Sequence, residues 1–111
     1  MLGIDIEFKK GILIVRLKGK LNRNTFLNVN EDLSNLIKNN GIRYLLLNVS
    51  DLDCIDEYGF NVIKNNYLNV LKNNGKMLLC GMDKVLNYMI NYNDTFYQIK
   101  DEEGAYQLIK I

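Results

Sequence analysis

Hydrophobic residues at the start of the chain alternate with polar ones. Ile4, Ile6 and Phe8 fall on every second position, which is the pattern of a strand with one face buried. After a short turn, a second and more continuous apolar run covers residues 12–17. The two runs predict an antiparallel pair of strands, with the half-polar first strand at an edge of the sheet.

Two later segments have apolar residues every three or four positions, which predicts two amphipathic helices. The inward positions are Phe26, Val29, Leu33, Leu36 and Ile37 in the first segment, and Phe60, Ile63, Tyr67, Val70 and Leu71 in the second. Each helix leads into Asn-Asn-Gly and then into an apolar strand, expected at residues 45–49 and 76–80. A glycine suits such a helix end because it can adopt the left-handed conformation.

The pattern of residues in the last third of the chain predicts three more elements. Asp83 can cap a short helix with its apolar face at Val85, Leu86, Met89 and Ile90; residues 96–99 form a strand; and Asp101 precedes a helix with Ala105, Leu108 and Ile109 inward. Strands that alternate with helices imply a parallel sheet. We therefore expect an α/β domain over residues 1–111, with a mixed, mostly parallel sheet of about five strands, an antiparallel N-terminal strand and about four helices.

The segment between strand 45–49 and the second helix carries the strongest signal for a functional surface. We expect an acidic loop over residues 50–56 and a helix that begins with Asp56 as its N-cap, because the Asp56 side chain can accept hydrogen bonds from the free N–H groups of the first turn. Loops 19–25, 50–56 and 81–83 should all leave the same end of the sheet, where α/β folds place their functional surfaces.

Composition narrows the classes of function. Of 111 residues, 48% are hydrophobic and 24% charged, and the net charge is +1, which provides no bulk electrostatic argument for a nucleic-acid partner. The first residues lack the apolar core of a signal peptide, and no run approaches the ~18 residues of a membrane span. The sequence thus predicts a cytoplasmic protein without a membrane segment, in which Cys54 and Cys80 are structural thiols.

The side chains available for chemistry are few. The chain contains no histidine, which excludes histidine-based triads and most zinc sites, and it has neither a P-loop nor a GxGxxG motif. A carboxylate cluster, Asp51, Asp53, Asp56 and Glu57, could in principle bind a hard cation or act as an acid–base pair. Its spacing does not match a calcium loop, and capping explains two of its members. We predict no cofactor, no metal and no enzymatic activity, with a small acidic-site enzyme or a phospho-receiver domain as the alternative.

The pattern Asp51-Leu52 followed by Asp56-x-x-Gly59, between an apolar strand and an amphipathic helix, resembles the STAS domain of bacterial anti-sigma-factor antagonists. The segments 2–6 and 75–80 are similar to the same family of sporulation and stress regulators. The resemblance implies a non-enzymatic regulator of transcription that binds an anti-sigma factor, itself a serine kinase. In the family this kinase phosphorylates a hydroxyl just after the aspartate, and the added charge of about −1.5 to −2 prevents binding.

The resemblance implies a partner-binding surface made of six residues: Asn22, Thr25, Asp56, Glu57, Tyr58 and Gly59. The chain departs from the family at three of them, because Glu57 and Tyr58 stand at the hydroxyl positions and Asn22 replaces an aspartate. Glu57 is either a favoured first-turn residue, worth roughly 0.3–1 kcal/mol, or a permanent partial phosphate mimic. Under both interpretations the phospho-switch is absent. A STAS subunit of another signalling assembly is the alternative within the family.

Overall fold

The computed structural model describes residues 2–81, 83 and 97–109. The elements in chain order are β1 (Leu2–Lys9), β2 (Ile12–Leu21), α1 (Phe26–Asn40), β3 (Tyr44–Ile55), α2 (Glu57–Lys72), β4 (Lys76–Cys80), β5 (Tyr97–Ile99) and α3 (Glu103–Ile109). The helix predicted around Val85, Leu86, Met89 and Ile90 lies outside the described residues. Among the described residues, no helix is long and apolar enough to cross a membrane.

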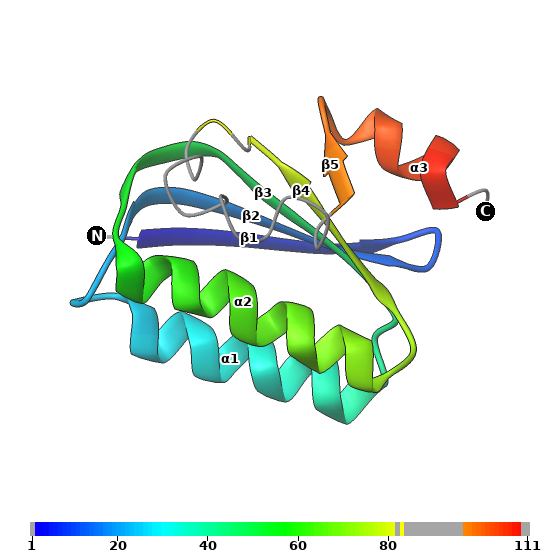
Figure 1. The fold of residues 1–111 in the computed structure, drawn as a ribbon, viewed down its shortest axis with the longest axis horizontal. Coiled ribbons are helices and arrows are strands. Elements are labelled where there is room, and N and C mark those ends of the chain that lie inside the picture. The colour runs from blue at the N-terminus through cyan, green and yellow to red at the C-terminus, as the bar shows by residue number, and fades with distance from the viewer. Residues whose placement is uncertain (1, 82, 84–96, 110–111) are drawn as a thin grey trace.

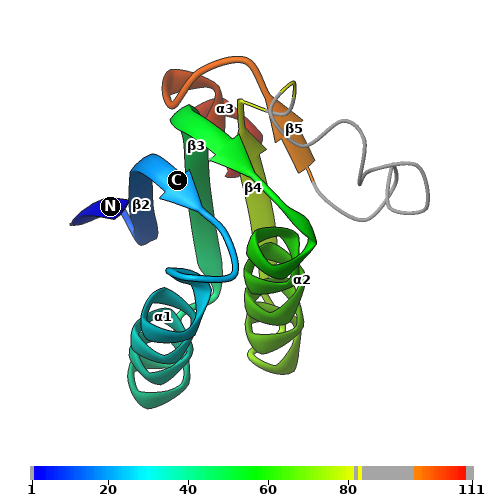
Figure 2. The ribbon, with the colours of Figure 1, turned by 90° about the vertical axis from the view of Figure 1, so that its left-hand side faces the viewer.

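The sheet has the predicted topology. Its strand order is β1-β2-β3-β4-β5, with β1 antiparallel to β2 and every other neighbouring pair parallel. Helices α1 and α2 lie side by side on one face, and α3 lies on the other (Figures 1 and 2). The half-polar strand β1 forms an edge, as its alternating pattern predicts, but the expectation of a buried face is wrong because Ile4, Ile6 and Phe8 stay exposed.

Side chains from alternate positions of the central strands fill two cores. Leu13, Val15 and Leu17 of β2 pack in the larger core, which α1 and α2 cover. Ile12 and Ile14 point to the opposite face and pack in the smaller core with Ala105 of α3. Because both faces of β2 are covered, its sequence is a nearly continuous apolar run, as expected for a central strand.

The predicted acidic loop over residues 50–56 is wrong. β3 continues to Ile55 and pairs with the extended end of β2, where the register shifts between Arg16 and Lys18 and again between Gly19 and Lys20. Such irregularities bend a strand and let polar residues stay exposed, which explains why this segment lacks the pattern of a buried strand. Of the two free cysteines, Cys80 is buried and Cys54 is exposed on this extension.

The two Asn-Asn-Gly segments end their helices in different ways. Gly41 has φ +58° and closes α1 in the left-handed conformation, as predicted. After α2, however, it is Asn74 that adopts positive φ, at +60°. Gly75 is needed for a different reason, since a Cβ at this position would collide with the backbone of Arg43.

Two predicted inward positions are wrong. Leu71 is 43% exposed and Leu108 is 46% exposed. In α2 the buried stripe ends at Val70, which leaves the adjacent residue about 100° away from the core. In α3, a helix of seven residues, Ala105 is the one fully buried side chain.

A polar layer lies inside the contact between α1 and α2. Asn66 is completely buried, and its Nδ2 donates to the Val62 carbonyl at 2.8 Å. Asn69 Nδ2 donates to Asn66 Oδ1 at 3.3 Å and to Ser34 Oγ of α1 at 3.1 Å. Buried polar groups need such partners, so these contacts favour one alignment of the two helices.

Arg16 connects β2 to the segment before α3. Its Nε and Nη2 donate to the two carboxylate oxygens of Glu102, both at 2.8 Å, and Nη1 and Nη2 also reach Asp5 and Glu7. Asn48 donates to Glu102 as well. The hydrogen bonds from Arg16 lower the pKa of Glu102, and those carboxylates, Glu102 foremost, raise the pKa of Arg16.

Replacing Glu102 with glutamine is expected to lower the free energy of unfolding by about 1.5–3 kcal/mol at neutral pH, the range for hydrogen bonds to charged groups. Because the Glu102 pKa lies below its usual 4.5 in the folded protein, this contribution is present above pH 4.5 and disappears as the pH falls further. Urea unfolding at pH 7 and at progressively lower pH measures it. Glu103→Gln, at an exposed neighbour, is the control; an equal loss at every pH would contradict the prediction.

Candidate functional site

The amino ends of α1 and α2 lie together at one end of the sheet, on the left in Figure 1. Leu21 and Ile55, the last residues of β2 and β3, are paired in register. Their adjacent ends bring together residues that are more than thirty positions apart in the sequence. We call the following six residues the tip surface: Asn22, Thr25, Asp56, Glu57, Tyr58 and Gly59.

Asp56 is the N-cap of α2, as predicted. Its backbone is extended, with φ −117° and ψ −171°, and its Oδ1 accepts a hydrogen bond from the Gly59 N–H at 2.9 Å. Glu57 is the first residue of the helix. The geometry satisfies one of the free N–H groups at the helix start and places an anionic side chain at the positive end of the helix dipole.

The second carboxylate oxygen of Asp56 has a role that the sequence did not reveal. Asp56 Oδ2 accepts from the backbone N–H of Arg23 at 3.0 Å, in the connection between β2 and α1. The Asp56 N–H in turn donates to the Leu21 carbonyl at 3.3 Å. Asp56 thus joins two loops that have no local relation in the sequence, and no spacing rule could have found the contact.

Asn22 and Thr25 shape the connection between β2 and α1. The Asn22 carbonyl accepts from the backbone N–H groups of Thr25 and Phe26, and its Oδ1 accepts from the Asn24 N–H at 2.9 Å. Thr25 Oγ1 accepts from the Asn22 N–H at 3.0 Å and donates to the Lys20 carbonyl at 2.8 Å. The polar groups of both residues therefore fix the loop, and Thr25 makes no side-chain cap for α1.

Gly59 allows α2 to approach the end of β2 closely. A Cβ at this position would lie 2.8 Å from Ile55 Cγ1 and 2.9 Å from Leu21 Cγ, and would overlap the Leu21 carbonyl oxygen. Gly59 is buried, so it supports the tip surface from beneath. Only a residue without a side chain fits this approach.

The exposed part of the tip surface combines a carboxylate with an aromatic ring. The side chain of Glu57 is exposed and has no ion pair or hydrogen bond with any residue that the structure describes. Tyr58 is 40% exposed, and its ring centroid lies 5.2 Å from that of the half-buried Phe26. The sequence pattern placed Phe26 on the inward face of α1 and missed this contact. Phe60, by contrast, is a core residue as predicted.

Gly81 does not reach the tip surface. β4 ends at Cys80, which pairs with Asn48, whereas β3 continues to Ile55. Gly81 consequently lies against Ser50, in the middle of the long strand. At this end of the sheet the connection after β2 therefore meets the start of α2 at the end of the long strand β3, and Gly81 is not part of that meeting.

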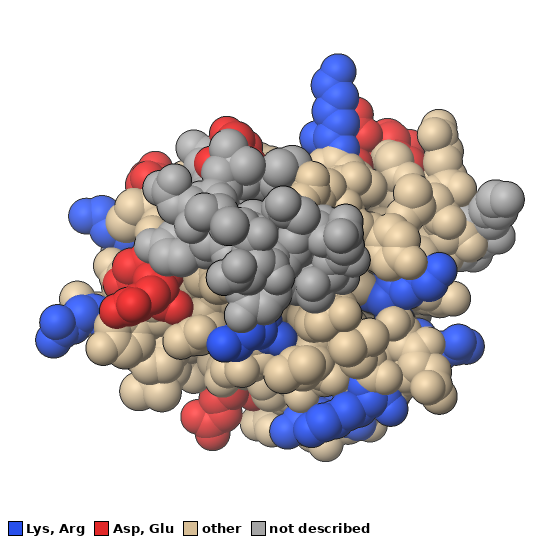
Figure 3. Space-filling view, in the orientation of Figure 1, with Lys and Arg blue, Asp and Glu red and all other residues tan. Residues whose placement is uncertain are grey.

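The carboxylates near the tip surface do not form a metal site. Asp51 and Asp53 are exposed residues of β3, and within residues 2–81, 83 and 97–109 no group of three His, Cys, Asp or Glu side chains could hold a metal ion. On the face shown in Figure 3, cationic and anionic side chains both lie around the rim. This arrangement matches a chain whose net charge is close to zero.

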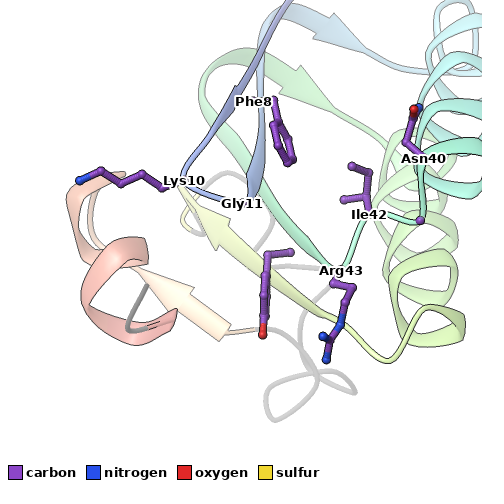
Figure 4. A pocket seen from close by; sticks show the side chains of 8 residues that line it. Phe8, Lys10, Gly11, Asn40, Ile42 and Arg43 are labelled. Carbon is purple, nitrogen blue, oxygen red and sulfur yellow. The ribbon is translucent and has the colours of Figure 1, made fainter.

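A pocket of about 410 Å³ lies at the opposite end of the sheet, beside the β1–β2 turn and the α1–β3 connection. Its lining includes Phe8, Asn40 and Ile42, while Lys10 extends away from them (Figure 4). The Lys10 ammonium instead lies 5.0 Å from the centre of the Tyr106 ring. The pocket therefore shares no residue with the tip surface.

A five-stranded mixed sheet of this topology, with two helices on one face and a capped helix start beside the β2–α1 connection, defines a small α/β domain. The chain belongs to the STAS domain family, whose model matches residues 3–94. The anti-sigma F factor antagonist of Paenibacillus polymyxa is 26% identical over 95 residues, which cover 86% of this chain and 81% of that protein.

Several solved structures have the same fold, and two of them are described as anti-sigma factor antagonists. An antagonist from Mycobacterium paratuberculosis has a TM-score of 0.83 at 13% identity, covering 100% of this chain and 96% of its own. Unphosphorylated SpoIIAA has a TM-score of 0.80 at 14% identity, with coverage of 97% and 98%. A serine-to-glutamate variant of RsbS from Moorella thermoacetica has 0.78 at 15%, with coverage of 97% and 98%.

Proposed function

We propose that this STAS domain is an anti-sigma-factor antagonist that binds an anti-sigma factor of the serine-kinase class through its tip surface. The observation that carries the proposal is an exposed carboxylate, Glu57, at the capped start of α2 and beside the β2–α1 loop. The relative from Paenibacillus polymyxa, named for the same activity, supports it. Binding a partner protein would control transcription without any reaction at the site itself.

The hydroxyl groups near the tip surface support a fixed state instead of a phosphorylation switch. Positions 57 and 58 hold Glu and Tyr. The Thr25 hydroxyl is occupied by two backbone contacts in its loop. Ser50 lies back along β3, where its Oγ is 3.7 Å from Cys80 Sγ. We therefore propose that Glu57 holds the surface in one signalling state.

Two results are expected when the protein is incubated with a purified anti-sigma kinase, ATP and magnesium. The protein should bind the kinase equally well before and after incubation, and intact-mass spectrometry should show no added phosphate. Isothermal titration calorimetry measures the binding. The positive control is the antagonist that normally binds this kinase. That antagonist should acquire phosphate and then no longer bind.

Phosphate on Ser50 or Tyr58 would contradict the fixed state while leaving the antagonist role in place. Failure to bind any kinase of this class would reject the antagonist role and would favour a STAS subunit of another signalling assembly. The two parts of the proposal can thus fail separately.

A further inference from the structure

β1 is the edge strand of the sheet, and no described element covers its apolar side chains. Ile4 is 40% exposed, Ile6 45% and Phe8 62%, and all three project from the face that carries α1. β1 pairs with β2 over all eight of its residues without a register shift. In Figure 2 it forms the border of the sheet beside α1. A regular edge strand of this kind is suited to pair with another strand.

A shallow groove accompanies this edge. Between β1 and the end of α1 is a pocket of about 380 Å³ with Phe8 and Leu36 among its lining residues. Phe8 and Ile42 line both this pocket and the neighbouring pocket of about 410 Å³, which is the one that Figure 4 shows. At the other end of the strand, Leu2 and Ile4 line a second hollow against α1. The apolar surface therefore follows the whole length of β1.

Charge along β1 is distributed unevenly. Asp5 and Glu7, together with Glu102, surround the single guanidinium of Arg16, so carboxylates are in excess there. Asp5 keeps 68% of its side-chain surface exposed. Lys9 is the last residue of the strand, next to the β1–β2 turn. If a second copy of β1 paired antiparallel with this strand, Lys9 of that copy would lie near the carboxylates of Asp5 and Glu7.

We propose that β1 pairs antiparallel with β1 of a second copy of the chain, with the two Glu7 residues facing each other across the two-fold axis. In this register Ile6 lies opposite Phe8, and Asp5 lies opposite Lys9, twice each by symmetry. The register centred on Ile6 would instead place Asp5 opposite Glu7 in both pairs, and like charges directly opposite are unfavourable. Each Glu7 already accepts a hydrogen bond from Arg16 at 2.9 Å, which offsets the single like-charged contact.

Sedimentation equilibrium tests the pairing. The unmodified protein should approach the mass of a dimer as concentration rises. Ile6→Lys should weaken the association about tenfold or more, because pairing would bury an ammonium group without a partner. Leu68→Lys is the matched control and should leave the association unchanged, because Leu68 is a 47% exposed leucine of α2, and α1 lies between α2 and the β1 edge (Figure 2). A monomer at every concentration, or equal losses in the two variants, would overturn the proposal.

Disulfide trapping tests the register without relying on the fold of Ile6→Lys. In a Cys54→Ser background, Glu7→Cys should form a cross-linked dimer under mild oxidation, because facing residues have Cα atoms about 4.5–5.5 Å apart and disulfides need about 4.4–6.8 Å. Lys9→Cys should not, since the two copies of that residue would be about 14 Å apart along the strands. Cross-linking through position 9 but not position 7 would overturn the register.

Discussion

Replacing Gly59 with alanine is expected to lower the free energy of unfolding by about 1–3 kcal/mol, the usual range for overpacking a tight contact. The added Cβ would lie 2.8 Å from Ile55 Cγ1 and would overlap the Leu21 carbonyl oxygen. A backbone oxygen in a paired strand cannot move aside as a flexible side chain can, so α2 must shift. The same carbonyl accepts from the Asp56 N–H. Urea unfolding measures the loss, and weaker partner binding should accompany it.

Gly104→Ala is the matched control for this substitution. Gly104 is also helical, but a Cβ there would meet only ordinary contacts, the nearest at 3.7 Å. Alanine has a higher helix propensity than glycine, by up to about 1 kcal/mol, so this variant should be unchanged or slightly stabilised. If Gly59→Ala behaved in the same way, the close approach of α2 to β2 would not constrain position 59.

The largest expected change in binding comes from Glu57→Ser. The substitution introduces a hydroxyl at the exposed start of α2, two residues before the Gly59 N–H that Asp56 already occupies. An anti-sigma kinase should transfer phosphate to this hydroxyl, and the added charge of about −1.5 to −2 should then abolish binding. Titration calorimetry before and after incubation with ATP, combined with mass spectrometry, measures both steps.

Glu57→Ala separates the hydroxyl from the loss of the carboxylate. This variant should bind the kinase but acquire no phosphate, and its affinity should not depend on ATP. If Glu57→Ser binds the kinase yet is never modified, then position 57 is not equivalent to the phosphorylated position of the family. If the alanine variant gains affinity over the unmodified protein, the carboxylate acts as a partial phosphate mimic.

The spacing of apolar residues predicted most of the fold because the central strands and the two long helices each have a surface that must be buried. The alternation in β1 and the three-to-four spacing in α1 and α2 identified strands, helices and the antiparallel edge. Asp56 was predicted as a cap because this interaction involves only neighbouring residues. The family motif then indicated the end of the sheet at which we propose the partner-binding site.

The features that sequence patterns missed depend on contacts between distant segments. The extension of β3 to Ile55 has no buried-strand pattern, since bulged pairing leaves much of it exposed. The hydrogen bond from the Arg23 N–H to Asp56 joins residues 33 positions apart. Asn66 is a polar residue that the spacing of apolar residues did not place in the core, yet it is completely buried between α1 and α2. Such pairings follow from how whole elements pack.

The two oxygens of the Asp56 side chain affect how tightly a partner can bind. One oxygen holds the first turn of α2 and the other holds the connection after β2, so both loops have a set shape before any encounter. Ordering loops during association costs free energy, and here that cost has already been met by folding. A partner would therefore recognise a preformed surface, and its affinity would depend on side-chain complementarity more than on loop closure.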